Sequence, residues 1–250
     1  MSSLDGAAVP RRGRRRRRRW REGGSSTARW DVELLGWAVC AVGVGVIGAH
    51  LAPALFPVET AAGGAQGIIW TAMAAPVALA FARSRPRGLL RFRAIDVVYG
   101  LVFGILLRLA QGAVAGIGDG DAPWPSVFST DGGLPPGFIV DAVAGSLFTP
   151  TIEELLFRGV VLVSAYAVLR RSVGGAAAGI AAVAVSTALF VAAHELAALR
   201  DPADLVALTL LSVVAGAFTI GTGRIWPAVA VHVVFNASGF ALLAAGTLLS

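Results

Sequence analysis

The sequence predicts an all-α protein, a polytopic bundle of seven to eight transmembrane helices, and three observations lead to this prediction. Apolar residues make up 56% of the 250 residues and charged residues only 14%, whereas a soluble domain has about 25% charged residues. Largely uncharged apolar stretches recur along the chain, and each is long enough to cross about 30 Å of hydrocarbon as a helix. The stretches are too long and too continuously apolar to be barrel strands. An ordinary soluble fold is therefore excluded.

The predicted spans follow one another from residue 34 to residue 249. They cover residues 34–56, 65–82, 94–117, 137–169, 175–198, 204–222 and 226–249. The fourth stretch is longer than one crossing needs and has Pro150 near its middle. It is therefore either one kinked helix or a short helix followed by a full one, and this choice leaves seven or eight spans.

The basic residues, all of them Arg, are unevenly distributed along the chain. Residues 1–29 contain ten Arg against two acidic residues, while residues 30–250 contain eleven Arg against thirteen acidic residues. Short loops rich in Arg favour the cytoplasmic side of a membrane. The N-terminus and the Arg-rich loop at 83–93 are therefore expected in the cytoplasm. The loop at 118–136, with three Asp and no Arg, is expected outside.

Residues 1–29 are predicted to form a disordered, Arg-rich cytoplasmic tail, because blocks of like charge are usually solvated. The tail lacks the interleaved aromatic residues that specific nucleic-acid binding would need, so no nucleic-acid partner is expected. Contact with anionic lipid is the favoured role. Cys40 is the single cysteine of the chain, which excludes a disulfide framework and a Cys-based metal site.

Ionisable side chains deep in a span are functional candidates, because each costs about 2.5 to 3.5 kcal/mol on insertion scales. Arg108 and Asp141 are two of them, and the others fall in three short motifs. In the first motif, Glu154 and Arg158 stand four residues apart on one helix face and are expected to pair. Glu153 points about 100° away and is left free for chemistry. A purely structural ion pair is the alternative for Glu154 and Arg158.

The other two motifs each contain one histidine. His194 follows Phe190 by one helical turn, and it begins a His-Glu-x-x-His zinc pattern that fails because Ala198 stands at the second histidine position. His232 and Asn236 are four residues apart and share a helix face. Two donors aimed at one point could stabilise an oxyanion, or they could form a polar clamp between helices.

Three motifs in this order resemble the CAAX protease and bacteriocin-processing family, also called the type II CAAX prenyl endopeptidase or Abi family. They are Glu-Glu-x-x-x-Arg at 153–158, Phe-x-x-x-His at 190–194 and His-x-x-x-Asn at 232–236. The resemblance covers about residues 137–245 and does not extend to the first three spans. It implies an intramembrane catalytic domain at 137–250 and a location in a bacterial plasma membrane, whereas the transmembrane helices at 30–136 are predicted from their apolar stretches alone.

The resemblance implies an intramembrane endopeptidase that hydrolyses a peptide bond near the C-terminus of a membrane-associated peptide or lipidated protein. Glu153 and His194 would activate a water molecule, and His232 with Asn236 would stabilise the oxyanion. The residues expected to support the site are Glu154, Arg158 and Phe190. An unpaired carboxylate, an imidazole and a donor pair are also what water-mediated hydrolysis requires on chemical grounds.

Three alternatives accompany this interpretation. No metal is favoured, but if the enzyme depends on one, Glu153, His194 and His232 form a ligand set that catalytic zinc accepts. A non-catalytic membrane scaffold, sensor or bacteriocin-immunity protein could keep the polar cluster for stability or partner binding. A transporter is disfavoured because the span pattern contains no inverted repeat.

The depths of the two histidines conflict with a shared site if every span crosses the membrane fully. His194 would then lie near the external end of its span and His232 near the cytoplasmic end, about 15 to 20 Å apart in depth. A shared site therefore predicts either a broken or re-entrant segment within 190–225 or span boundaries that are wrong by a turn or more. His50, at the outer end of the first span, has no predicted partner.

Overall fold

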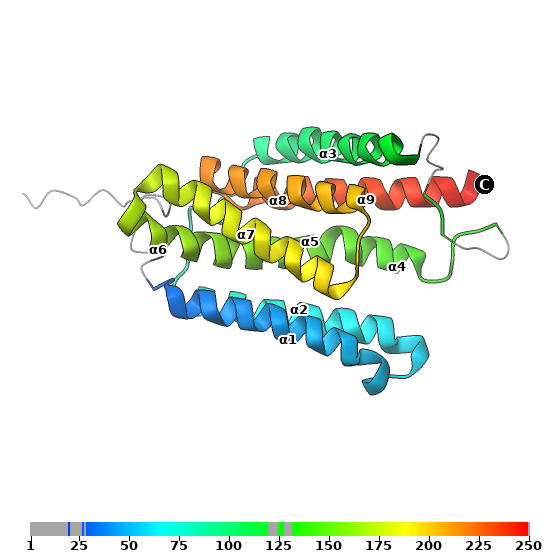
Figure 1. The fold of residues 1–250 in the computed structure, drawn as a ribbon, viewed down its shortest axis with the longest axis horizontal. Helices are drawn as coiled ribbons and strands as arrows, with labels where there is room; N and C mark the ends of the chain where they lie inside the picture. Colours follow the sequence, from blue (N-terminus) through cyan, green and yellow to red (C-terminus); the bar gives the residue numbers. More distant parts are fainter. Residues whose placement is uncertain (1–19, 21–26, 28, 120–124, 128–131, 250) are drawn as a thin grey trace, which may run out of the picture.

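The computed structural model describes residues 20, 27, 29–119, 125–127 and 132–249. The predicted disordered tail at 1–29 lies almost entirely outside these residues. The described part of the chain is an all-α bundle of long helices (Figure 1), which confirms the predicted fold class. Its helices are α1 (Val32–Leu55), α2 (Val58–Arg83), α3 (Ile95–Asp119), α4 (Phe138–Val143), α5 (Thr149–Glu154), α6 (Val163–Val173), α7 (Gly175–Ala197), α8 (Pro202–Thr222) and α9 (Trp226–Leu249).

Six of these helices are long and apolar enough to cross a membrane: α1, α2, α3, α7, α8 and α9. A seventh rod runs without interruption from α4 to α6, because the π-helical segments η3 (Ala144–Phe148) and η4 (Leu155–Leu162) join its three α-helices. The fourth predicted span is therefore one continuous helix. The described residues form seven passes along the bundle.

Pro150 explains the first widening of this rod. A proline has no backbone N–H and its ring collides with the carbonyl group four residues earlier, which here belongs to Ser146 in η3. The backbone N–H of Thr149 instead donates to the carbonyl oxygen of Ala144, five residues back. The helix thus continues past Pro150 with one wide turn, and such π-turns occur often at functional sites.

The outer faces of α1 and α3 carry large apolar side chains. Val44 and Ile47 on α1 are each 63% exposed, and Leu109 on α3 is also 63% exposed. Hydrocarbon tails solvate such faces, so helix packing inside the bundle depends on close approach and polar contacts instead. Gly104 of α3 provides one close approach, because a Cβ built on it would lie 2.7 Å from Val234 of α9.

The turn between α7 and α8, residues 198–201, lies part-way along the bundle and well short of the end that α4 and α9 reach (Figure 1). Helix α7 runs obliquely to its neighbours, so its last turn lies beside the middle of the rod from α4 to α6. The sequence prediction of a break within 190–225 is wrong, because α7 and α8 are each continuous. Their observed bounds also lie within two residues of the predicted ones. The predicted conflict between the depths of the two histidines arose from the assumption that every span extends over the full length of the bundle.

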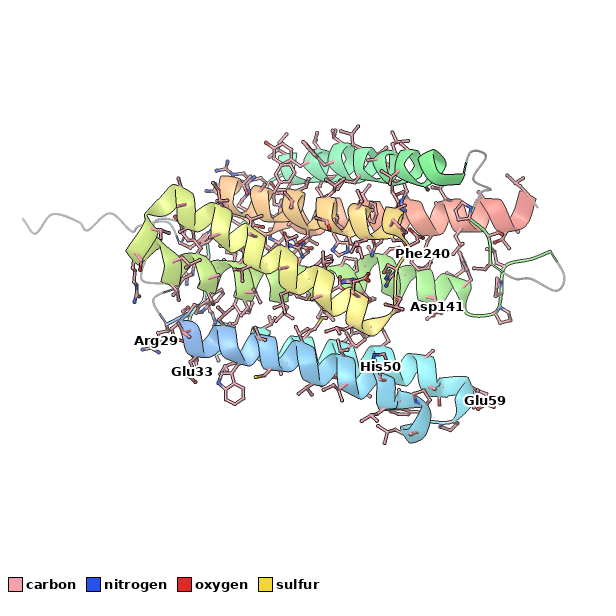
Figure 2. The ribbon with its side chains drawn as sticks, in the orientation of Figure 1. Arg29, Glu33, His50, Glu59, Asp141 and Phe240 are labelled. Atoms are coloured by element: carbon pink, nitrogen blue, oxygen red, sulfur yellow. The ribbon has the colours of Figure 1, made fainter. Side chains whose placement is uncertain are left out.

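Two further expectations are corrected by the positions of single side chains (Figure 2). Asp141 is exposed in the first turn of α4 near one end of the bundle, and is not a buried charge. His50 does have a partner, since its Nε2 lies 2.8 Å from the carbonyl oxygen of Leu196 on α7. This contact connects α1 to the last turn of α7.

Candidate active site

Glu153 lies where two cavities meet in the middle of the bundle. Its side chain is buried, and the whole residue is only 6% exposed. The first cavity, here called the apolar pocket, has a volume of about 280 Å³ and is walled mainly by α1, α2 and α7. The second, the polar pocket, has a volume of about 260 Å³ and is walled by α3, α8 and α9. Both are lined by Thr149, Glu153, His194 and Arg200.

The two predicted histidines approach the Glu153 carboxylate from different helices. His194 Nε2 is 3.8 Å from Glu153 Oε1, and His232 Nε2 is 3.7 Å from Glu153 Oε2. These distances are too long for direct hydrogen bonds, but they place both rings against one carboxylate. The residues that the sequence predicted to share a site are therefore brought together, despite their separate helices.

Each imidazole is oriented by a contact at its other nitrogen. His194 Nδ1 lies 2.8 Å from the carbonyl oxygen of Phe190, and His232 Nδ1 lies 2.9 Å from Glu154 Oε1. A carbonyl or carboxylate oxygen can only accept, so in each neutral ring Nδ1 carries the hydrogen. Both Nε2 atoms are then acceptors that face Glu153.

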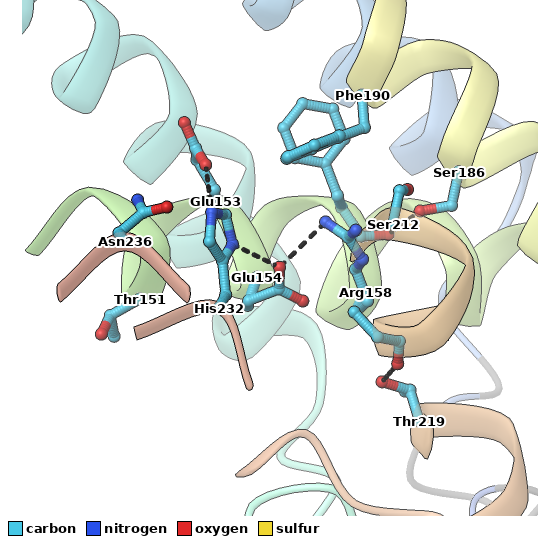
Figure 3. A network of polar contacts seen from close by, with 12 residues as sticks. Thr151, Glu153, Glu154, Arg158, Ser186, Phe190, Ser212, Thr219, His232 and Asn236 are labelled. Atoms are coloured by element: carbon cyan, nitrogen blue, oxygen red, sulfur yellow. Dashed lines mark hydrogen bonds and ion pairs between the residues drawn. The ribbon is translucent and has the colours of Figure 1, made fainter. Parts of the chain in front are cut away.

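Glu154 connects His232 to a buried arginine (Figure 3). The predicted pair of Glu154 and Arg158 forms, with Arg158 Nη1 3.0 Å from Glu154 Oε1, and both side chains are fully buried. The same carboxylate oxygen accepts the His232 hydrogen bond. Phe190 covers the cluster, because the Arg158 guanidinium lies 4.5 Å from its ring centroid and the His194 ring 4.4 Å away. Glu153 and Glu154 thus have separate environments although they are adjacent in sequence.

Asn236 lies one turn after His232 on α9 and lines the same polar pocket. Its Nδ2 donates to the carbonyl oxygen of Gly145 at 2.9 Å. Gly145 belongs to the widened segment η3, so the hydrogen bond fixes α9 against the turn that precedes Glu153. One N–H of the Asn236 amide is used in this way, and the second is left for the pocket.

The alternative zinc site would require the ligand atoms of Glu153, His194 and His232 to converge on one point. Among the described residues, no group of three or more His, Cys, Asp or Glu side chains is arranged to hold a metal ion. No catalytic step is therefore assigned to a metal held by Glu153, His194 and His232. Metal independence itself stays a prediction.

Four residues of the polar pocket received no role from the sequence. Arg108 and Gln111 come from α3, Arg200 from the α7–α8 turn and Asp204 from the start of α8. Arg108 donates to the carbonyl oxygen of Phe235 at 2.6 Å, next to Asn236. Its position inside an apolar span was a signal for function, whereas Arg200 gave none because it lies in a loop.

The fold and site together define a polytopic membrane protein with an acid–base cluster buried at the meeting point of two cavities. Residues 135–238 match the family model described as type II CAAX prenyl endopeptidase Rce1-like. This match supports the resemblance to the CAAX-type intramembrane protease family that the sequence motifs predicted, and the six long apolar helices indicate an integral membrane protein. The match runs from the residues before α4 into α9 and leaves α1 to α3 outside it. No curated protein and no solved structure matches the chain.

Proposed function

We propose that this protein is an intramembrane endopeptidase that hydrolyses a peptide bond near the C-terminus of a membrane-associated peptide or lipidated protein. One observation carries the proposal: the Glu153 carboxylate faces the Nε2 atoms of His194 and His232 at 3.8 and 3.7 Å. The family match supports the reaction type. We further propose that the protein lies in a bacterial plasma membrane, with its N-terminus in the cytoplasm and its Arg-rich tail on anionic lipid.

In this mechanism Glu153 is the general base. It accepts a proton from a water molecule while the water oxygen attacks the carbonyl carbon of the scissile bond. His194 Nε2 accepts a hydrogen bond from the second hydrogen of the same water and fixes its direction of attack. The proton then passes from Glu153 to the leaving amine when the C–N bond breaks, so water is the only co-reactant.

The oxyanion of the tetrahedral intermediate would lie in the polar pocket. The second N–H of the Asn236 amide can donate to it directly. His232 can donate from Nε2 only as an imidazolium ion, because its Nδ1 hydrogen is already directed at Glu154. Glu154 is therefore a positioning residue, which orients His232 and would stabilise its positive charge, while Arg158 holds Glu154 in place.

The Glu153→Gln variant tests the proposal. Gln keeps the shape of the side chain but cannot accept the proton, so we expect kcat to fall by about 10³-fold or more with normal expression and membrane insertion. The assay is cleavage of an internally quenched, prenylated peptide by the purified full-length protein. Asp141→Asn is the matched control, because it removes an exposed carboxylate from the same rod. Equal activity of the Glu153→Gln variant and the parent protein would favour the scaffold alternative.

Chelation tests the expected metal independence. The predicted result is that a strong zinc chelator, followed by its removal, leaves the initial cleavage rate unchanged within twofold or so. A known zinc protease treated in parallel shows that the chelator is effective in the same detergent. Loss of activity that added zinc restores would overturn the metal-free mechanism while leaving the peptidase proposal intact.

A further inference from the structure

A separate cavity lies at the end of the bundle where the loop between α2 and α3 meets the turn between α8 and α9. It has a volume of about 130 Å³, and three arginines, Arg91, Arg93 and Arg224, line it together with Trp20 and residues of the two connections. We call it the basic pocket. None of its lining residues lines the apolar or the polar pocket at Glu153.

The arginines of the basic pocket are not equally paired. Arg224 is held by Asp96, with Nη2 2.5 Å from Oδ1 and Nε 3.3 Å from Oδ2, and Asp96 is fully buried. Arg91 and Arg93 are exposed and have no ion-pair partner among the described residues. The pocket therefore presents two uncompensated guanidinium groups, which are suited to bidentate binding of a phosphate.

The pocket lies at the level where membrane helices end. Helix α2 ends at Arg83, α3 begins at Ile95 and α8 ends at Thr222, so the connections between them stand at the boundary of the hydrocarbon layer. Trp226, at the start of α9, donates from Nε1 to the carbonyl oxygen of Leu90 at 2.7 Å. Tryptophan at the end of a span is typical of the lipid headgroup level.

Trp20 forms one wall of the basic pocket and is only 3% exposed. Its Nε1 donates to the carbonyl oxygen of Gly223, and its ring packs edge-to-face on Tyr166 with centroids 6.3 Å apart. In the sequence, six arginines at 14–19 directly precede Trp20 and Arg21 follows it. These contacts fix Trp20 against the turn between α8 and α9 and against α6.

We propose that the basic pocket binds the phosphate group of an anionic phospholipid, held by Arg91 and Arg93. Two observations favour a lipid over a free anion: the pocket lies at headgroup level, and interfacial aromatic residues flank it. The proposal is independent of the peptidase activity, because it concerns a different cavity and needs no substrate.

The Arg91→Gln/Arg93→Gln variant of the full-length protein tests the site. The protein is equilibrated with mixed micelles that contain equal amounts of phosphatidylglycerol and phosphatidylcholine, and the lipids that remain bound are identified by native mass spectrometry. Each interfacial arginine contributes about fivefold to binding of anionic lipid, so the double variant is expected to lose about 30-fold in preference for phosphatidylglycerol. Single Arg91→Gln and Arg93→Gln variants keep the test available if the double variant does not fold.

Arg170→Gln/Arg171→Gln is the matched control, because it removes two arginines from the last turn of α6, outside the basic pocket. This control is expected to keep at least half of the preference for phosphatidylglycerol. Equal loss in both double variants would overturn the proposal in favour of general surface charge, as would an unchanged preference in the Arg91→Gln/Arg93→Gln variant. Displacement of the lipid by millimolar inorganic phosphate would overturn it in favour of a free anion, whereas retention of the lipid supports it.

Discussion

The C-terminal region from α4 to α9 and the N-terminal helices α1 to α3 contribute to the cavities in different ways. The C-terminal region supplies Glu153, both histidines and the buried ion pair behind them. The N-terminal helices supply walls: Val42, Val46 and other residues of α1 and α2 line the apolar pocket, while α3 lines the polar pocket with Arg108 and Gln111. Only the C-terminal region matches the family. The proposed catalytic groups therefore come from the C-terminal region alone, whereas the pocket walls come from both regions.

The largest expected effect on stability comes from the interior of the C-terminal region. Glu154→Gln would leave the fully buried Arg158 without its carboxylate, and removal of one partner of a buried pair costs about 3 to 5 kcal/mol. Glu153→Gln should cost much less, because the histidine nitrogens stand 3.7 and 3.8 Å from the Glu153 carboxylate, too far to form hydrogen bonds that the substitution would break. The unfolding midpoint in mild detergent measures both variants.

The Glu154→Leu/Arg158→Met variant replaces the whole buried pair with apolar side chains. An apolar replacement of a whole buried pair is often neutral, so the double variant should recover most of the stability that Glu154→Gln loses. It should not recover activity, because His232 still lacks its oriented acceptor. If Glu154→Gln is no less stable than Glu153→Gln, the assignment of different roles to these adjacent carboxylates is wrong.

Helix periodicity was sufficient to predict contacts within one helix, because it determines which side chains share a face, whereas the meeting of the three motifs was expected from their resemblance to the family. The four-residue spacing predicted the pair of Glu154 and Arg158, which forms at 3.0 Å, and the three motifs do line a common cavity. The sequence could not predict the oblique course of α7, because helix tilt depends on packing between distant segments. The depths of His194 and Arg200 in the bundle depend on that tilt. The depth of His194 was therefore predicted wrongly, and Arg200 was not recognised as a residue of the site.

A smaller loss of stability is expected from a substitution at the contact between the N-terminal helix α3 and the C-terminal helix α9. Gly104 of α3 lies so close to α9 that a Cβ would stand 2.7 Å from Val234 and 2.9 Å from the carbonyl oxygen of Val231. Gly104→Ala should therefore move α3 away from α9 and destabilise the protein by about 1 to 3 kcal/mol. Activity should fall with it, because α9 carries His232 and Asn236.

Gly112→Ala is the control for this contact, because a Cβ there would meet nothing within 4 Å. On the same helix α3, alanine in place of this glycine should be neutral or stabilise by up to about 1 kcal/mol. Thermal unfolding and cleavage rate are measured for both variants. If Gly104→Ala behaves like Gly112→Ala, α3 is not a supporting wall for α9.

The smallest effect is expected from the wall that α1 contributes to the apolar pocket. Val46 lines this pocket, and Val46→Phe would fill part of its space with an aromatic ring. A hydrophobic pocket changes its preference between substrates by about tenfold when a small apolar group is added or removed. We therefore expect Val46→Phe to raise KM about tenfold for substrates with a bulky apolar group beside the scissile bond, with kcat for a small substrate unchanged.

Val44→Phe is the matched control on the same helix, because Val44 is 63% exposed on the outer face. Glu153 and His194 line the same pocket. A uniform fall in kcat for all substrates would therefore mean that α1 supports the acid–base cluster directly, and the assignment of α1 to the pocket wall alone would be wrong.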